Sequence, residues 1–528
     1  MIEKRIMRVP LLSSMIRYHS PHFPATFLWA WVLLLSHAAT LGDKVADHPN
    51  VVIIYADDLG YGDLSCYGAN ALKTPRIDAL AKGGLMFTDG HAAAATCTPS
   101  RFAMLTGQYA WRRQDTGIAR GDAPLIIPPD TFTLADLFKQ AHYTTGVVGK
   151  WHLGLGPAGG ADWNGVIQPG PLELGFDYAF LIPATGDRVP CVYVENHRVV
   201  GLDPEDPIQV SFKERVGSEP IGAERPDLLT MHPSHGHDRT IINGISRIGY
   251  MSGGTAARWN DENMADDITD KALEFIERQS KKPFFLFFSL HDIHVPRVPH
   301  PRFRGQTAMG PRGDAIAQTD WCVGQIMDKL GEKGLVENTL VIFTSDNGPV
   351  IDDGYKDQAV EQLGEHHPSG PFRGGKYSAF EAGTRVPWIM HWPAGIAHGR
   401  SAALVSQVDL IASFADLLGQ RLDDESSPDG LNMMMALLGK DPIGRKELVL
   451  QARSLSLRRG QWKWIEPSRA QAFNRQTQIE LGNHPDGWLF YLGDDLGESR
   501  DLKEDYPGIV TSMQDSLDRI RGQKRDPK

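Results

Sequence analysis

Short apolar runs alternate with amphipathic stretches along most of the chain. The runs are rich in Val, Ile, Leu and Phe, and continuous apolar segments of this length are typical of buried strands. The predicted strands cover residues 51–55, 144–148, 283–290 and 339–344. Apolar residues at helical spacing predict helices around residues 77–81, 268–276, 316–330 and 408–418. Because strands that alternate with helices build parallel sheets, we expect an α/β layer structure with a large, mostly parallel sheet between helices.

The pattern changes after a polar stretch at residues 420–429, which we interpret as a linker. Strand-like segments follow at residues 447–451, 461–465 and 488–492, and a helical repeat covers residues 509–520. We therefore expect one large domain over residues 46–425 and a smaller C-terminal α+β subdomain with an antiparallel sheet over residues 430–528. Residues 157–264 are rich in Gly, Pro and polar side chains, which predicts insertions beside a functional site.

The N-terminal segment has the layout of a secretory signal. Basic residues from Lys4 to Arg17 precede the apolar run Phe27–Leu35, and the small pair Ala38-Ala39 follows. The run is shorter than the roughly 20 residues that a membrane span needs. We expect a signal peptide over residues 1–42, no integral membrane span, and a secreted or periplasmic protein; the alternative is a buried or frayed N-terminal segment.

Composition and charge narrow the class of protein. Hydrophobic residues make up 41% and charged residues 23%, which is ordinary for a globular chain. The formal charge of -11 argues against a nucleic-acid-binding protein. Four cysteines are too few for a disulfide-built scaffold, and their spacing fits no zinc motif.

Polar side chains follow four of the predicted strands directly. The pairs are Asp57 with Asp58, Lys150 with His152, His291 with His294, and Asp346 with Asn347. Each pair alone has a structural explanation as a turn or cap. Ligands of open α/β sheets bind at the carboxyl ends of the strands, so we expect these groups to converge. Three carboxylates and one amide oxygen suit Ca²⁺ or Mg²⁺, although a solvated acidic turn needs no metal.

The segment Cys97-Thr98-Pro99-Ser100-Arg101 predicts a reactive group at a helix N-terminus. Thr98 suits the N-cap and Pro99 the first helical turn, so Cys97 would face the free amides that favour anions. Arg101, one turn later, would return to the same point. The alternative is a buried free cysteine beside a helix cap.

These residues and the Leu-Thr-Gly that follows resemble the C-x-P-S-R signature of the type I sulfatases. Further blocks resemble the same family in the same order, at residues 57–63, 149–154, 345–348, 372–376, 381–387 and 489–495. The resemblance implies an alkaline-phosphatase-like fold and a sulfuric ester hydrolase. It implies as substrate a sulfated carbohydrate or an aryl sulfate.

The resemblance also implies the active-site chemistry. A formylglycine-generating enzyme would oxidise Cys97 to Cα-formylglycine, whose hydrate attacks the sulfur of the ester. The implied ligands of Ca²⁺, or of Mg²⁺, are Asp57, Asp58, Cys97, Asp346 and Asn347. The implied catalytic residues are Cys97, Arg101, Lys150, His152, His294 and Lys376. Among these, Arg101, Lys150, His294 and Lys376 would contact the sulfuryl group, and His152 would take a proton from the second hydroxyl.

Several roles stay open at this stage. The family pattern favours His294 over His291, because His294 stands before x-Pro. Thr185 occupies a region where many relatives place a sulfate-contacting serine, and His366 and His367 either line the cleft or belong to a polar surface loop. Two other functions fit the same fold: a phosphoester or phosphonate hydrolase, and a non-catalytic glycan-binding relative.

Overall fold

A ten-stranded mixed sheet forms the centre of the protein, whose computed structural model describes residues 48–279 and 282–522. Its strand order is β15-β2-β14-β13-β1-β12-β4-β5-β6-β7. The strands are β1 Asn50–Ala56, β2 Leu85–Phe87, β4 Thr144–Lys150, β5 Tyr178–Ile182, β6 Val194–Glu195, β7 Arg198–Val199, β12 Phe284–Ser289, β13 Thr339–Ser345, β14 Trp388–His391 and β15 Gly399–Ser401. The central order β13-β1-β12-β4-β5 is parallel throughout, which confirms the predicted α/β class.

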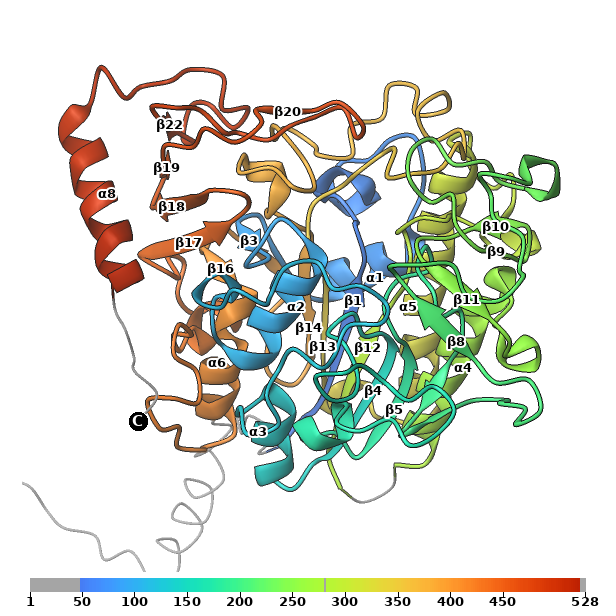
Figure 1. The fold of residues 1–528 in the computed structure, drawn as a ribbon. Helices are drawn as coiled ribbons and strands as arrows, with labels where there is room; N and C mark the ends of the chain where they lie inside the picture. Colours follow the sequence, from blue (N-terminus) through green and yellow to red (C-terminus); the bar gives the residue numbers. More distant parts are fainter. Residues whose placement is uncertain (1–47, 280–281, 523–528) are drawn as a thin grey trace, which may run out of the picture. The chain divides into compact units, whose positions relative to one another are not determined.

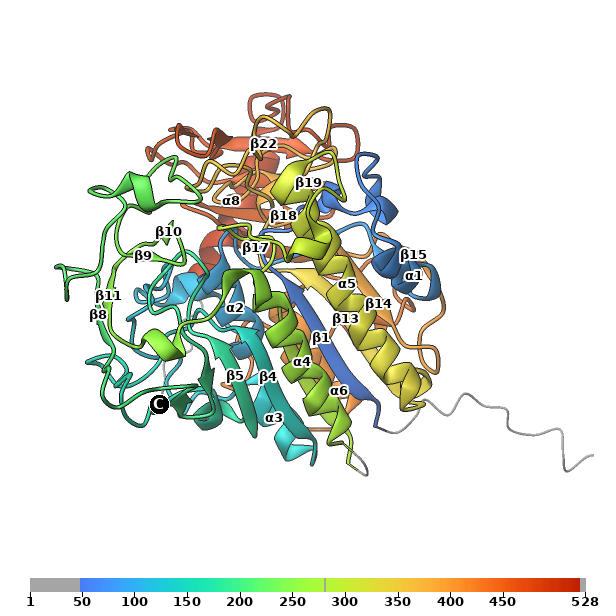
Figure 2. The same cartoon turned by 90° about the vertical axis from the view of Figure 1, so that its right-hand side faces the viewer.

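Helices cover both faces of this sheet (Figures 1 and 2). One face carries α1 Pro75–Gly83, α4 Met264–Glu277 and α5 Gly310–Glu332; the other carries α2 Cys97–Thr106, α3 Leu134–Gln140 and α6 Leu410–Leu417. Close approach between layers uses small residues: a Cβ at Gly146 of β4 would lie 2.6 Å from the Phe275 ring of α4. The strands are buried on both faces, as their continuous apolar sequences predict.

A separate four-stranded antiparallel sheet lies in the C-terminal part of the chain, as expected. Its strands are β17 Glu447–Gln451, β18 Leu455–Arg459, β19 Trp462–Ile465 and β22 Trp488–Tyr491. Helix α8, Pro507–Gly522, packs on it through Met513 and Leu517, which share a core cluster with Trp464 of β19 and Ala103 of α2. The C-terminal sheet therefore shares core contacts with the helix that begins at Cys97. The domain boundary near residues 425–430 stays a prediction.

The remaining strands and the remaining α-helix are short. They comprise β3 Gly90–His91 with β16 Val405–Ser406, β8 Gln209–Ser211 with β11 Tyr250–Ser252, β9 Ile241–Ile242 with β10 Ile245–Ser246, β20 Phe473–Asn474 with β21 Ile479–Glu480, and helix α7 Met434–Leu437. Two of these pairs, β8–β11 and β9–β10, belong to the Gly- and Pro-rich section in which insertions were expected.

The expected signal peptide lies outside the described residues. Within residues 48–279 and 282–522, no helix has the length and apolar character that crossing a bilayer requires.

Candidate active site

Strand register brings the predicted polar groups together at one edge of the sheet. Ala56 of β1 pairs with Ser345 of β13, so Asp57 and Asp346 emerge side by side. The Asp346 amide donates to the Ala56 carbonyl at 3.1 Å, and the Asp57 amide donates to the Asp292 carbonyl beyond β12 at 2.9 Å. The convergence expected from the sequence is therefore present.

Cys97 is the first residue of α2 and is 1% exposed. The residue before it, Thr96, holds the N-cap position, so the expectation that Thr98 caps the helix is wrong. The Thr98 hydroxyl instead donates to the His152 carbonyl at 3.0 Å and accepts the Ala119 amide at 3.1 Å. Burial raises the pKa of the Cys97 thiol, and the nearby Lys150 and Lys376 oppose that shift.

Asp57, Asp58, Asp346 and Asn347 bring their side-chain oxygens together in what we call the acidic pocket, which suits a hard cation. Ligand atoms of Asp57, Cys97 and Asp346 all lie within 4.8 Å of one another. Two oxygens of this site, Asp57 Oδ1 and Asn347 Oδ1, are buried without a hydrogen-bond partner among the described residues. Buried oxygens of this kind are costly unless something donates to or coordinates them. The donor set therefore fits a divalent cation bound by oxygen.

Three buried cationic side chains partner these carboxylates. Lys150 Nζ lies 2.6 Å from Asp57 Oδ2, and Arg101 Nε donates to Asp346 Oδ2 at 2.9 Å. Lys376 Nζ donates to Asp58 Oδ2 and also to Asp353 Oδ2, both at 2.8 Å. Burial alone would lower the pKa of Lys376, but the adjacent Asp353 and Asp58 hold it well above its ordinary value.

The two predicted catalytic histidines are buried and held through one nitrogen each. His152 Nε2 lies 2.9 Å from the Ala119 carbonyl, and its Nδ1 has no hydrogen-bond partner in the described chain. His294 Nδ1 lies 2.8 Å from the Val295 carbonyl, and its Nε2 lies 3.8 Å from Asp58 Oδ2. Since only an N–H can bond a carbonyl, each ring carries its proton there when neutral. Burial is the main cause that puts the pKa values of both histidines well below the ordinary value, and the positive charge of a neighbouring lysine lowers each pKa further.

The structure adds a buried group that the sequence did not single out. Asp353 accepts from Lys376 and from the Tyr377 hydroxyl at 3.1 Å. It stands in an irregular segment six residues after Asn347, without a strand to mark its position. Burial raises the pKa of Asp353, but Lys376 outweighs this and the net shift is downward.

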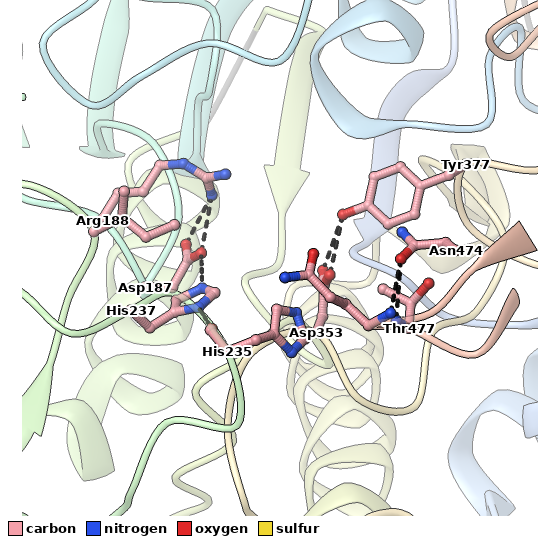
Figure 3. Close-up of a pocket in the computed structure, with 10 residues that line it drawn as sticks. Asp187, Arg188, His235, His237, Asp353, Tyr377, Asn474 and Thr477 are labelled. Atoms are coloured by element: carbon pink, nitrogen blue, oxygen red, sulfur yellow. Dashed lines mark hydrogen bonds and ion pairs between the residues drawn. The ribbon is translucent and has the colours of Figure 1, made fainter. Parts of the chain in front are cut away.

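A cavity of about 190 Å³ opens beside Asp353 (Figure 3). Asp187, Arg188 and His237 form one wall, and Asp353, Tyr377, Asn474 and Thr477 face them from the other. Arg188 Nη1 donates to Asp187 Oδ1 at 2.8 Å, and His237 Nε2 lies 3.0 Å from Asp187 Oδ2. The second wall contains residues of the β20–β21 hairpin, so the C-terminal part of the chain contributes to the cavity.

The residues whose roles were open lie in different surroundings. Thr185 is buried and hydrogen-bonded to Asp187 and Arg188 at the edge of the cavity. His366 does not line the cavity: its Nε2 bonds Asp63 Oδ1 at 2.8 Å, beside the Asp63–Arg312 ion pair. His367 is exposed, and His291 Nε2 lies 3.5 Å from Asp292.

The sheet is mainly parallel and covered on both faces, and the acidic residues and Cys97 lie at its carboxyl edge. This architecture agrees with the alkaline-phosphatase-like hydrolase fold that the motif resemblance implies, and solved structures share it. A family model named Sulfatase matches residues 49–420. The protein therefore belongs to the sulfatase family and is a sulfatase, which confirms the resemblance drawn from its motifs.

Individual relatives agree with this assignment. The chain is 53% identical to the N-acetylgalactosamine-6-O-sulfatase of Bacteroides thetaiotaomicron over 90% of this chain and 93% of the relative. It is 32% identical to human arylsulfatase A, over 93% and 90% of the two chains. A solved sulfatase structure described under the metabolism of multiple glycosaminoglycans by Bacteroides thetaiotaomicron has a TM-score of 0.90 at 52% identity. The match covers 90% of this chain and 100% of the chain in that structure. The phosphonate monoester hydrolase of Agrobacterium radiobacter, at 18% identity and a TM-score of 0.55, shares the fold.

Proposed function

We propose that this sulfatase removes the 6-O-sulfate from an N-acetylated hexosamine at the end of a sulfated carbohydrate. Support comes from the relative at 53% identity, which is named an N-acetylgalactosamine-6-O-sulfatase and is covered over 93% of its length. A small polar cavity beside the acidic pocket suits one sugar ring, because its volume of about 190 Å³ is below the usual range for extended ligands.

We further propose that Cys97 is converted to Cα-formylglycine by a formylglycine-generating enzyme and acts beside Ca²⁺. The observation that carries this proposal is the position of Cys97, whose ligand atom lies within 4.8 Å of those of Asp57 and Asp346. Asp58 and Asn347 would complete the ligand set, and Mg²⁺ is the alternative ion. The ion would neutralise charge on the sulfuryl oxygens.

Arg101, Lys150 and Lys376 would hold the sulfuryl group in place. Arg101 is oriented through two of its nitrogens: Nη1 donates to the Lys150 carbonyl at 2.9 Å and to Ser289 Oγ at 2.6 Å, and Nε donates to Asp346 Oδ2 at 2.9 Å. Such fixed donors need no rearrangement when charge develops on the ester oxygens, which is how preorganised sites accelerate reactions. Lys376 would protonate the departing alcohol, because His294 carries its neutral-form proton on the nitrogen that bonds a carbonyl.

His152 would act as the base that takes a proton from the hydroxyl of residue 97. Its Nε2 carries the proton that bonds the Ala119 carbonyl, so the buried Nδ1 carries the lone pair that can accept a proton. A low pKa keeps this imidazole neutral and able to accept a proton at neutral pH.

We also propose export to the periplasm or the medium, on the order of basic, apolar and small residues near the N-terminus. Cell fractionation of the full chain tests this: recovery with cytosolic markers, at uncleaved length, would contradict export.

The proposed reaction is tested by measuring sulfate released from N-acetylgalactosamine 6-sulfate by protein made with a formylglycine-generating enzyme. Parallel assays use an aryl sulfate, an aryl phosphate and an aryl phosphonate at matched concentrations. We expect release from the sulfated sugar, and Cys97→Ala should abolish it while leaving the thermal unfolding transition in place. Faster turnover of the phosphate or phosphonate, or full activity of Cys97→Ala, would overturn the proposal.

A further inference from the structure

A second cavity, of about 290 Å³, adjoins the one beside the acidic pocket. The two share four lining residues, His235, His237, Ile248 and Gln476. A substituent on a molecule held in the first cavity therefore has a direct route past these residues into the second. Its other lining residues are Phe212 and members of the two short segments 236–239 and 248–250.

Two aromatic side chains of this second cavity are fixed by the backbone beneath them. Phe212 directly follows β8, whose last residue Ser211 pairs with Tyr250 of β11. The Phe212 ring rests on two glycines: a Cβ at Gly249 would lie 3.0 Å from its Cζ, and one at Gly121 would lie 3.3 Å away. A side chain at either position would crowd the ring, so these two glycines leave the space that Phe212 occupies.

Arginine side chains lie against both rings. The Arg120 guanidinium lies 5.7 Å from the centre of the Phe212 ring, and that of Arg239 lies 5.1 Å from the Tyr250 ring. Each arginine is also paired with a nearby carboxylate, Arg120 with Asp122 at 2.9 Å and Arg239 with Asp238 at 3.2 Å. Both arginine side chains are about half exposed, so they stay available to a polar sugar ring that carries a carboxylate.

We propose that this second cavity binds the sugar residue attached to the sulfated one, with Phe212 as its stacking platform. The inference rests on the proposed function, because it takes the sulfated ring to occupy the first cavity. Aromatic faces combined with a few amide and hydroxyl groups are what concave sites offer to ligands with both apolar and polar faces. Gln476, which lines both cavities, is placed to contact both rings.

The test compares two substrates: N-acetylgalactosamine 6-sulfate, and a chondroitin 6-sulfate trisaccharide whose non-reducing end is that same sugar. The wild-type enzyme should have the lower KM for the trisaccharide. Phe212→Ala should raise the trisaccharide KM about tenfold with kcat nearly unchanged, because it removes binding that the ground and transition states share. Its effect on the monosaccharide KM should be much smaller, and Phe212→Tyr should restore the preference.

Phe473→Ala is the matched control, since Phe473 is a partly exposed aromatic on β20 that lines neither cavity. It should leave both KM values unchanged. Equal wild-type KM values, or an equal effect of Phe212→Ala on both substrates, would overturn the second-sugar site while leaving the proposed reaction intact. Failure of the wild-type enzyme to release sulfate from either sugar would overturn the proposed reaction and this inference together.

Discussion

At the residue scale, the buried lysines and arginine of the active site are each compensated by a neighbouring carboxylate. Lys376 is 1% exposed and donates to two carboxylates, Asp58 and Asp353. Its positive charge also reduces the repulsion between these two carboxylates. A buried ion pair is costly to break because the remaining charge has no solvent. The same contacts fix the ammonium group beside the acidic pocket, so one side chain serves both stability and the proposed contact with sulfate.

Replacing Lys376 by Met should therefore lower both activity and stability. We expect a loss in kcat of about 10²–10³-fold, the range for removing one preorganised donor. The free energy of unfolding should fall by about 3–5 kcal/mol, because Asp58 and Asp353 lose their shared partner. Steady-state sulfate release and urea unfolding measure the two effects, and a variant with wild-type kcat would contradict the assignment.

The His237–Asp187 pair predicts a pH-dependent stability. Burial lowers the pKa of His237, but Asp187 outweighs it and the net shift is upward. Burial raises the pKa of Asp187, but Arg188 and the neighbouring histidines outweigh it and hold that pKa well below its ordinary value. A raised histidine pKa contributes stability that is complete below the unfolded value of about 6.5 and is lost as pH rises through the folded value. A depressed aspartate pKa contributes stability that is lost as pH falls.

The destabilisation caused by His237→Asn should thus be larger near pH ~5.5 than near pH ~8.5, on either side of the ordinary histidine pKa. Thermal unfolding at the two pH values measures it. His235→Asn, at the neighbouring and more exposed histidine, is the control. A destabilisation that grows toward alkaline pH would contradict the predicted sign.

Residues at regular positions could be predicted from the sequence, and residues in irregular segments could not. Asp57, Lys150 and Asp346 follow or end apolar strands, so their convergence follows from the sheet alone. Asp353 and Asp187 lie in segments without repeating structure, where no periodicity tells which way a side chain faces. The prediction that Thr98 caps α2 was wrong because its hydroxyl is hydrogen-bonded to the backbone of His152 and Ala119 instead.

At the scale of elements, the acidic pocket depends on three separate segments meeting. Asp57 follows β1, Asp346 follows β13, and Cys97 begins α2. A cation that binds this native arrangement and not the unfolded chain stabilises the protein by mass action. The proposed ion should therefore tie these elements together.

Removing Ca²⁺ with a chelator should lower the melting temperature and abolish sulfate release, and added Ca²⁺ should restore both. Asp57→Asn should weaken the response to Ca²⁺, because one charged ligand is lost, and should also lower the metal-free stability, because buried Lys150 loses its ion-pair partner. Differential scanning fluorimetry with and without chelator measures these shifts. A melting curve of the purified protein that ignores both chelator and Ca²⁺ would contradict the metal site.

Most of the central strands could be predicted from the sequence. Continuous apolar runs marked β1, β4, β12 and β13, because strands buried on both faces have no polar side. Strand β18, Leu455–Arg459, was missed since Ser456, Arg458 and Arg459 interrupt it. The order of strands and their register depend on contacts between distant segments, which a local pattern does not contain.

At the scale of the whole molecule, a buried ionic network connects the C-terminal sheet to the segment that carries Lys376. Arg458 of β18 donates to Glu381 Oε2 at 2.6 Å and to Asp89 Oδ2 at 3.0 Å. Lys463 of β19 lies 3.1 Å from Glu381 Oε1 and 2.8 Å from Glu498. Glu381 stands five residues after Lys376, so the C-terminal sheet braces the active-site segment.

Arg458→Ala should destabilise the protein by about 3–5 kcal/mol, because it leaves buried carboxylates uncompensated. Arg459→Ala, on the same strand, removes a partly exposed ion pair to Glu447 and hydrogen bonds to Ser512 and Ser516, and should cost clearly less, about 1 kcal/mol. Urea unfolding of the two variants measures the difference. Equal losses would show that the network does not hold the sheet in place.

The central claim concerns the chemical state of residue 97, and mass spectrometry of the tryptic peptide that contains it tests that claim most directly. In protein made with a formylglycine-generating enzyme, we predict a peptide whose mass corresponds to an aldehyde in place of the thiol and which reacts with a hydrazine reagent. An unmodified Cys97 thiol in preparations that release sulfate at full rate would contradict the account.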